Sequence, residues 1–232
     1  MLVYNGKLGT FATFAYNESI TIVFPAGFAL NDPVCAFWQW TQDAANRNKK
    51  INVNELGFIS SVTTKNDEYK LTFTFDFYGF NVTVAGDAST IEVSLFNPAN
   101  NQSAATKLER QYNNLVQFRS TAVFTGKLNW FKYAENEMLT LVIPRGVSNG
   151  APVGLYHQWT VDASGVEKAN NAVNSTFRDV KTDADGETKG TFGDGYYTYK
   201  VTLRSNGKEV EIVMSNPSHA ETKNELKKVY GY

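Results

Sequence analysis

Apolar and polar residues alternate along much of this chain, with the two-residue period of a β-strand whose side chains point to opposite faces in turn. Leu71, Phe73, Phe75 and Phe77 share one face of an expected strand. The same period recurs at 80–84, 91–95, 199–203 and 210–214. Two continuous apolar runs, Ser19–Phe24 and Met138–Ile143, predict strands that are buried on both faces or lie at a sheet edge.

Turn and cap residues predict how these strands are connected. The Asn206-Gly207 pair between two alternating runs is a strong hairpin signal, and Gly86-Asp87-Ala88 takes the equivalent place in the first half. Each half is expected to close with a short helix, because Ser218 and Glu221 have capping-box spacing. Helical spacing follows at Leu226, Val229 and Tyr230, and it is echoed earlier at Leu108, Tyr112 and Leu115.

The two halves of the chain repeat each other at a spacing of 119 residues. Pro25 falls on Pro144, Gln39-Trp40-Thr41 on Gln158-Trp159-Thr160, and Asn97-Pro98 on Asn216-Pro217. The sequence therefore predicts an all-β protein built by tandem duplication of an antiparallel β-sandwich or flattened-barrel unit, each unit ending in a short helix. The expected repeats are residues 1–114 and 115–232. The apolar segment Gln111–Thr121 predicts that they touch in a roughly fixed relation.

Composition narrows the classes of partner. No apolar run approaches the ~18 residues of a membrane-spanning helix. A net charge of −1 offers no general attraction to nucleic acid. Cys35 is the only cysteine, which precludes an intramolecular disulfide, and the first residues lack the features of a secretory signal. We expect a protein that is cytoplasmic as synthesised, with later release from the cell left open.

The residues give little support for catalysis. His157, His219 and Cys35 each occur in one half only, and no known nucleophile, phosphate-loop or metal-ligand motif is present. The open route is glycoside hydrolysis by a carboxylate pair, Asp43 with Asp76 or Asp162 with Asp194. The alternating carboxylates at 183–187 suit calcium, but a solvated acidic turn is the favoured interpretation. We therefore expect no enzyme, no cofactor and no metal.

The segment Gln-Trp-Thr-x-Asp, which occurs once in each half, is the strongest candidate for function. An aromatic ring beside an amide and a carboxylate suits sugar recognition, because the ring covers apolar C–H faces and the polar groups bond hydroxyls. Trp40 and Trp159 fit core positions equally well, whereas Trp38 is expected to be exposed because its counterpart is His157. The candidate ligand-binding residues are Trp38, Trp40, Asp43, Tyr78, His157, Trp159, Asp162 and Tyr197.

The sequence thus favours a carbohydrate-binding protein with two similar sites, which bivalence would make an agglutinin. In architecture and composition the plan resembles small signal-less β-sandwich lectins of fungi and bacteria. The expected partner is a glycan or glycoconjugate, and the oligomeric state is left open. Two alternatives stand beside it: a membrane-lipid-binding or pore-forming toxin that docks through aromatic loops, and a structural protein enlarged by the duplication.

Overall fold

The computed structural model describes residues 1–43, 45–111, 121–161 and 167–231. The chain divides into two compact units, a first of residues 1–116 with 160–170 and a second of residues 117–159 with 171–232. All regular structure within the described ranges is β-strand, as the two-residue period predicted. No helix long and apolar enough to span a membrane occurs in that part of the chain.

The first unit holds a nine-stranded antiparallel sheet in the order β6-β5-β4-β1-β11-β10-β9-β8-β7. Its strands are β1 (Leu2–Lys7), β4 (Ser19–Phe24), β5 (Pro33–Asp43), β6 (Asn46–Phe58), β7 (Ser61–Lys65), β8 (Glu68–Phe75), β9 (Tyr78–Val84), β10 (Thr90–Phe96) and β11 (Ser103–Arg110). A small hairpin of β2 (Thr10–Phe11) and β3 (Ala15–Tyr16) lies between β1 and β4 in the chain.

The second sheet also has nine strands, in the order β15-β14-β13-β12-β20-β19-β18-β17-β16. These strands are β12 (Thr121–Trp130), β13 (Ala134–Pro144), β14 (Pro152–Thr160), β15 (Lys168–Thr176), β16 (Arg178–Thr182), β17 (Thr188–Gly193), β18 (Thr198–Leu203), β19 (Glu209–Ser215) and β20 (Glu221–Tyr230). Strand by strand, this order is the same as that of the first sheet. The duplication in the sequence is therefore a duplication of one fold.

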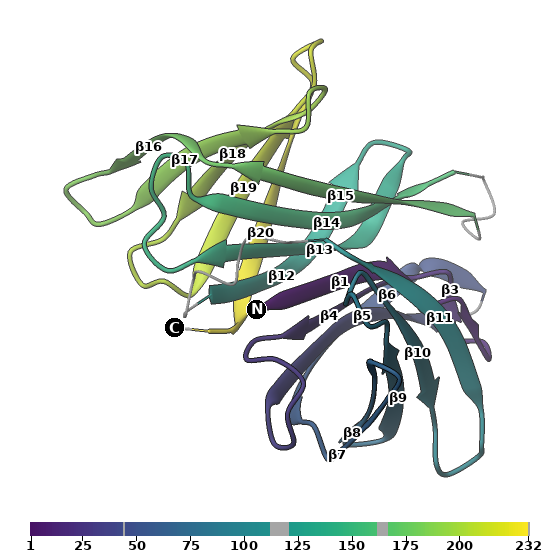
Figure 1. Cartoon of the computed structure of the whole chain (residues 1–232). Helices are drawn as coiled ribbons and strands as arrows, with labels where there is room; N and C mark the ends of the chain where they lie inside the picture. The colour runs from purple at the N-terminus through teal and green to yellow at the C-terminus, as the bar shows by residue number, and fades with distance from the viewer. Residues whose placement is uncertain (44, 112–120, 162–166, 232) are drawn as a thin grey trace. The chain divides into compact units, whose positions relative to one another are not determined.

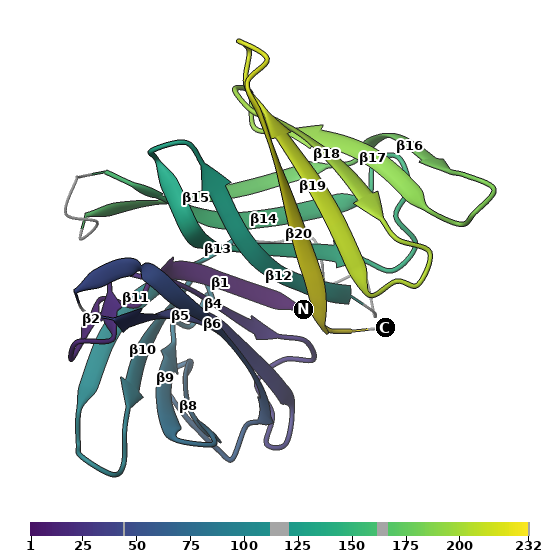
Figure 2. The ribbon, with the colours of Figure 1, turned by 180° about the vertical axis from the view of Figure 1, so that it is seen from behind.

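Each sheet curls around its own core, as Figures 1 and 2 show from opposite sides. In the first unit edge strand β6 approaches β8, the neighbour of the opposite edge strand: a Cβ added at Gly57 of β6 would lie 2.8 Å from the Phe75 ring of β8. Of the two predicted architectures, a flattened and partly closed barrel is the nearer description. Equivalent ring stacks fill both interiors, Phe73 on Phe80 at 5.1 Å and Phe192 on Tyr199 at 4.9 Å.

The predicted terminal helix of the second half is wrong, because residues 221–230 form strand β20. This strand lies between β19 and β12 and pairs with both, so its backbone groups are bonded to two neighbours. Sheet pairing overrides the local helical spacing, and Asn224 and Leu226 are buried with the two-residue period of a strand. In the first half Leu108 lies in β11, whereas Tyr112 and Leu115 are outside the described residues.

Other local predictions can be compared with the structure. Asn206-Gly207 forms the turn between β18 and β19, and Ala88 forms the equivalent turn between β9 and β10, both with positive φ at the second position. Every residue of β4 is buried, which confirms a strand covered on both faces. Phe77 is an exception: β8 ends at Phe75, and Phe77 lies exposed in the following turn. Most of the segment 111–121 lies outside the described residues.

Candidate ligand-binding site

A short exposed turn occurs at the same place in both units. In the first unit the amide of Phe14 donates to the carbonyl of Phe11 at 3.0 Å, with Ala12 at φ 49°. In the second unit the amide of Tyr133 donates to Trp130 at 2.9 Å, with Phe131 at φ 47°. Both turns connect paired strand residues, Phe11 with Ala15 and Trp130 with Ala134. The duplication has thus preserved an aromatic residue at each end of this turn.

A tryptophan and a tyrosine lie beside each turn. Trp40 and Tyr78 have ring centroids 5.4 Å apart and planes tilted by 43°. Their equivalents 119 residues later, Trp159 and Tyr197, lie 5.6 Å apart with a tilt of 34°. The buried ring at the start of the turn touches the pair in each unit: Phe11 lies 5.5 Å from Trp40, and Trp130 lies 5.4 Å from Tyr197. All four rings of the two pairs are half-buried.

Exposed aromatic residues complete the arrangement. Phe14 is 49% exposed and Phe77 is 75% exposed, and their equivalents Tyr133 and Tyr196 are 49% and 58% exposed. We name the two groups after their units. The first rim is Phe11, Phe14, Trp40, Phe77 and Tyr78, and the second rim is Trp130, Tyr133, Trp159, Tyr196 and Tyr197. Aromatic rings therefore occupy the same five positions in both copies, and exposed rings at two of them have no core-packing role.

The expected exposure of Trp38 is wrong, since Trp38 and its counterpart His157 are both 0% exposed. Trp38 packs edge-on against Trp40 and Tyr78 on the buried face of the curled sheet. A histidine fits the same buried position because its cross-strand neighbour changes with it: Val53 pairs with Trp38, whereas Asn171 bonds the His157 ring at 3.0 Å. Asn171 satisfies one nitrogen of the buried ring, while the Nδ1 atom of His157 has no hydrogen-bond partner among the described residues.

Burial also determines the charge of His157. Loss of hydration lowers its pKa to about 4, against smaller opposing effects from the Gln158 backbone and the Asp194 carboxylate. The Asn171 amide nitrogen only donates, so the His157 Nε2 atom that faces it accepts and carries no proton. The ring is therefore neutral at physiological pH. Titration of His157 is therefore not expected to change ligand binding near pH 6.5.

The polar members of the predicted segment do not gather at the rims. Gln39 and Gln158 are buried, and the Gln39 side-chain amide bonds Asn52 on the neighbouring strand at 2.7 Å. Asp43 ends β5, and Asp162 lies outside the described residues. Of the predicted site residues, the structure brings together Trp38, Trp40 and Tyr78 in one unit and His157, Trp159 and Tyr197 in the other.

Carboxylates lie beside both rims, but their surroundings differ. The carboxylate of Asp194 accepts the backbone amides of Tyr196 and Tyr197 and the hydroxyl of Tyr199, so it organises its own turn. In the first unit, burial and the nearby Asp76 raise the pKa of Glu55. Sequence reasoning missed Glu55. Only a comparison of the two halves could have singled it out, because the second copy has Val173 at the equivalent position, 118 residues later.

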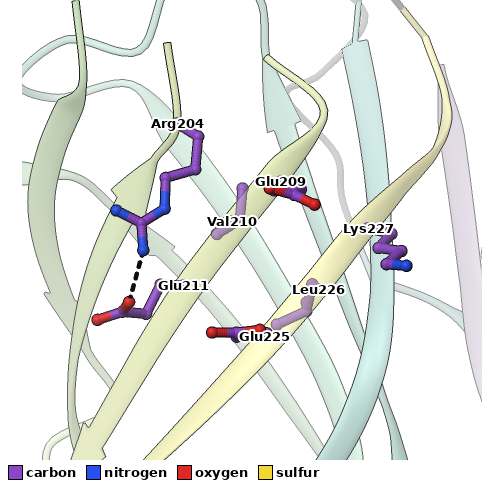
Figure 3. Close-up of a pocket in the computed structure, with 7 residues that line it drawn as sticks. All are labelled: Arg204, Glu209, Val210, Glu211, Glu225, Leu226 and Lys227. Atoms are coloured by element: carbon purple, nitrogen blue, oxygen red, sulfur yellow. Dashed lines mark hydrogen bonds and ion pairs between the residues drawn. The ribbon is translucent and has the colours of Figure 1, made fainter. Parts of the chain in front are cut away.

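Two other features are less suited to ligand binding. The acidic segment 183–187 is an exposed turn. Its Asp183 carboxylate accepts hydrogen bonds from two backbone amides and forms an ion pair with Lys189. Within the described ranges no group of three metal-ligating side chains occurs. A hollow of about 110 Å³ on the second sheet is lined by Arg204, Glu209, Val210, Glu211, Glu225, Leu226 and Lys227 (Figure 3). There Arg204 is already neutralised by Glu187 and Glu211.

Comparison with known proteins gives one partial match. The model of a family described as the C-terminal domain of Iso-A82775C biosynthesis cluster protein B matches residues 124–197. The matched range runs from β12 to Tyr197 and so contains the whole second rim. Neither the curated proteins nor the solved structures compared with the chain gave a match.

Proposed function

We propose that the protein binds carbohydrate, without catalysis, through one site at each aromatic rim. The observation that carries this proposal is the half-buried tryptophan–tyrosine pair, which occurs in both units at matching positions and with similar geometry. Two adjacent ring faces suit the apolar C–H face of a pyranose, and they leave its hydroxyls free for polar neighbours.

The setting of each pair supports the same function. The pair lies on a packed interior that holds it in place: Trp38 contacts both rings of the first pair, and Trp130 contacts Tyr197 of the second. Rigid rings lose little conformational entropy on binding. Two sites in one chain would also cross-link glycans on a surface, since avidity gains from duplication whereas catalysis needs only one complete site.

A glycan array and a red-cell agglutination assay test this function. Trp40→Ala is expected to abolish binding at the first rim and Trp159→Ala at the second. Each single variant should still bind glycan through its intact rim but lose agglutination, and the double variant should lose both activities. Tyr69→Ala is the matched control, because Tyr69 is an exposed aromatic residue on β8 outside the rim.

A blank array with folded protein would overturn carbohydrate binding. Dye release from liposomes that is independent of sugar and reduced in Phe77→Ala and Tyr196→Ala would instead favour the membrane-binding alternative, because these exposed rings are suited to a headgroup layer.

A further inference from the structure

The two rims share their aromatic residues but differ in charge. Identical backbone bonds align the two copies at this place: Ile59 bonds Asn31 and Asp32, and Phe177 bonds Gly150 and Ala151. Counting back four residues from Ile59 and from Phe177 aligns Glu55 with Val173. The first copy thus has a carboxylate where the second has a buried apolar side chain.

Glu55 lies on the first unit's interior face, close to the first rim. Glu55 pairs with Ala36 across β5 and β6, and the next pair on the same face is Trp38 with Val53. Two residues beyond Glu55, strand β6 lies against the end of β8, where Gly57 approaches the Phe75 ring. Asp76 follows Phe75 directly and Tyr78 comes two residues later, so this approach brings the two carboxylates together beside the aromatic pair.

The surroundings of Glu55 disfavour its ionised form. Glu55 is half-buried and the nearby Asp76 is exposed; burial raises the pKa of Glu55, and Asp76 raises it further. A cation removes the conflict, and the faces of tryptophan and tyrosine attract organic cations in particular. The second unit has no such conflict, because Val173 replaces the glutamate and Asp194 is bonded within its own turn.

A second polar group beside this site also has an unmet bonding capacity. The Trp38 indole nitrogen is fully buried and has no hydrogen-bond partner among the described residues. Its ring stands edge-on to both Trp40 and Tyr78, the two rings that form the centre of the first rim. An indole N–H only donates, so this buried donor lacks an acceptor beneath the aromatic pair. The site thus combines acceptors for an ammonium group with two flat apolar faces.

We propose that the first rim binds an amino sugar, with the ammonium group between Glu55 and Asp76 and the pyranose ring against Trp40 and Tyr78. This inference rests on the proposed carbohydrate-binding function and assigns a ligand class to one of its two sites. The second rim, which lacks the free carboxylate pair, takes neutral sugars.

Calorimetry on the full chain at pH 6 tests the assignment, with a glucosamine trimer as probe and the N-acetylglucosamine trimer as its neutral counterpart. All proteins in this experiment carry Trp159→Ala, so that only the first rim can bind the probe. We expect the amine to bind at least about tenfold more tightly than the acetylated trimer, because charge-assisted hydrogen bonds are the stronger kind. Glu55→Gln and Asp76→Asn should remove this preference. Asparagine tolerates the positive φ of 30° at position 76.

Two controls separate the possible explanations. Glu92→Gln makes the same change in net charge at an exposed position on β10 and should leave the preference intact. If it weakens amine binding as much as Glu55→Gln does, general electrostatics explain the result and the assignment falls. Ethanolamine, an amine without a ring, should bind at least about tenfold more weakly than the glucosamine trimer, because it cannot cover the aromatic pair. Equal binding would overturn the sugar part of the assignment.

Thermal unfolding establishes that each variant is folded, so a loss of binding is not a loss of structure. Equal affinity for both trimers, unchanged by Glu55→Gln, would overturn the amino-sugar assignment while leaving the carbohydrate function intact. Binding of neither trimer, together with a blank glycan array, would overturn both.

Discussion

The buried histidine of the second unit gives a quantitative prediction about acid stability. His157 is 0% exposed and takes a neutral form in which Nε2 accepts from Asn171. Burial lowers its pKa to about 4 in the folded protein. An unfolded chain returns the imidazole to its ordinary pKa of about 6.5. Between these two values the unfolded state binds more protons than the folded state, so acid favours unfolding.

The size of the effect follows from the two pKa values. The stabilisation is fully present above pH 6.5 and is lost as the pH falls toward 4, because each unit of difference corresponds to about 1.4 kcal/mol. With the folded value at about 4, the contribution lost by pH 5 is about 2 kcal/mol, a large part of a typical unfolding free energy.

Urea unfolding at a series of pH values measures this loss. The reference is the double variant His157→Phe with Asn171→Val, which replaces the polar pair by an apolar one like Trp38 with Val53 in the first unit. Carboxylates elsewhere titrate in both proteins and cancel in the difference. We expect the wild type to lose about 2 kcal/mol more than the variant between pH 7 and pH 5.

Parallel pH curves for the two proteins would refute the reasoning. An NMR titration of the histidine ring protons gives an independent check, with His219→Asn to assign the two resonances. A His157 resonance that shifts with a midpoint near 6.5 in the folded protein would show that the ring is hydrated and that its burial has no electrostatic consequence.

Three further predictions concern other buried or crowded groups. Burial raises the pKa of Cys35 to about 12, so a thiol reagent at pH 8 should react with it only after denaturation; rapid labelling of native protein would contradict its burial. Burial and Asp76 raise the pKa of Glu55, so ionised Glu55 destabilises the fold at neutral pH. Glu55→Gln should therefore raise the melting temperature at pH 7 but have little effect on it below pH 4. A lower melting temperature of this variant at pH 7 would count against the reasoning. A Cβ at Gly126 would clash with the Glu225 carbonyl oxygen, so Gly126→Ala should lower the unfolding free energy by about 1–3 kcal/mol. Gly207→Ala is the comparison: a Cβ there meets nothing within 4 Å, so this variant measures the cost of positive φ alone.

The sequence pattern was enough to predict the β-rich architecture and its duplication. A two-residue period leaves little alternative to strands, and the spacing of 119 residues aligns the two Gln-Trp-Thr segments of the sheets. The Asn-Gly turn was also predictable, because its backbone conformation depends on two adjacent residues alone. Local chemistry therefore determined the strands, the turns and the repeat.

Other features depended on neighbours that are distant in the chain. Residues 221–230 have helical spacing, but β12 and β19 supply backbone partners on both sides and make them a strand. Trp38 is buried because Trp40, Tyr78 and Phe80 converge on it in the curled sheet. Glu55 approaches Asp76 only because the sheet curls until edge strand β6 meets β8 at Gly57 and Phe75. The periodicity of a strand fixes which residues share a face, but the curvature of the sheet decides which of those faces meet, and that is a property of the tertiary structure alone.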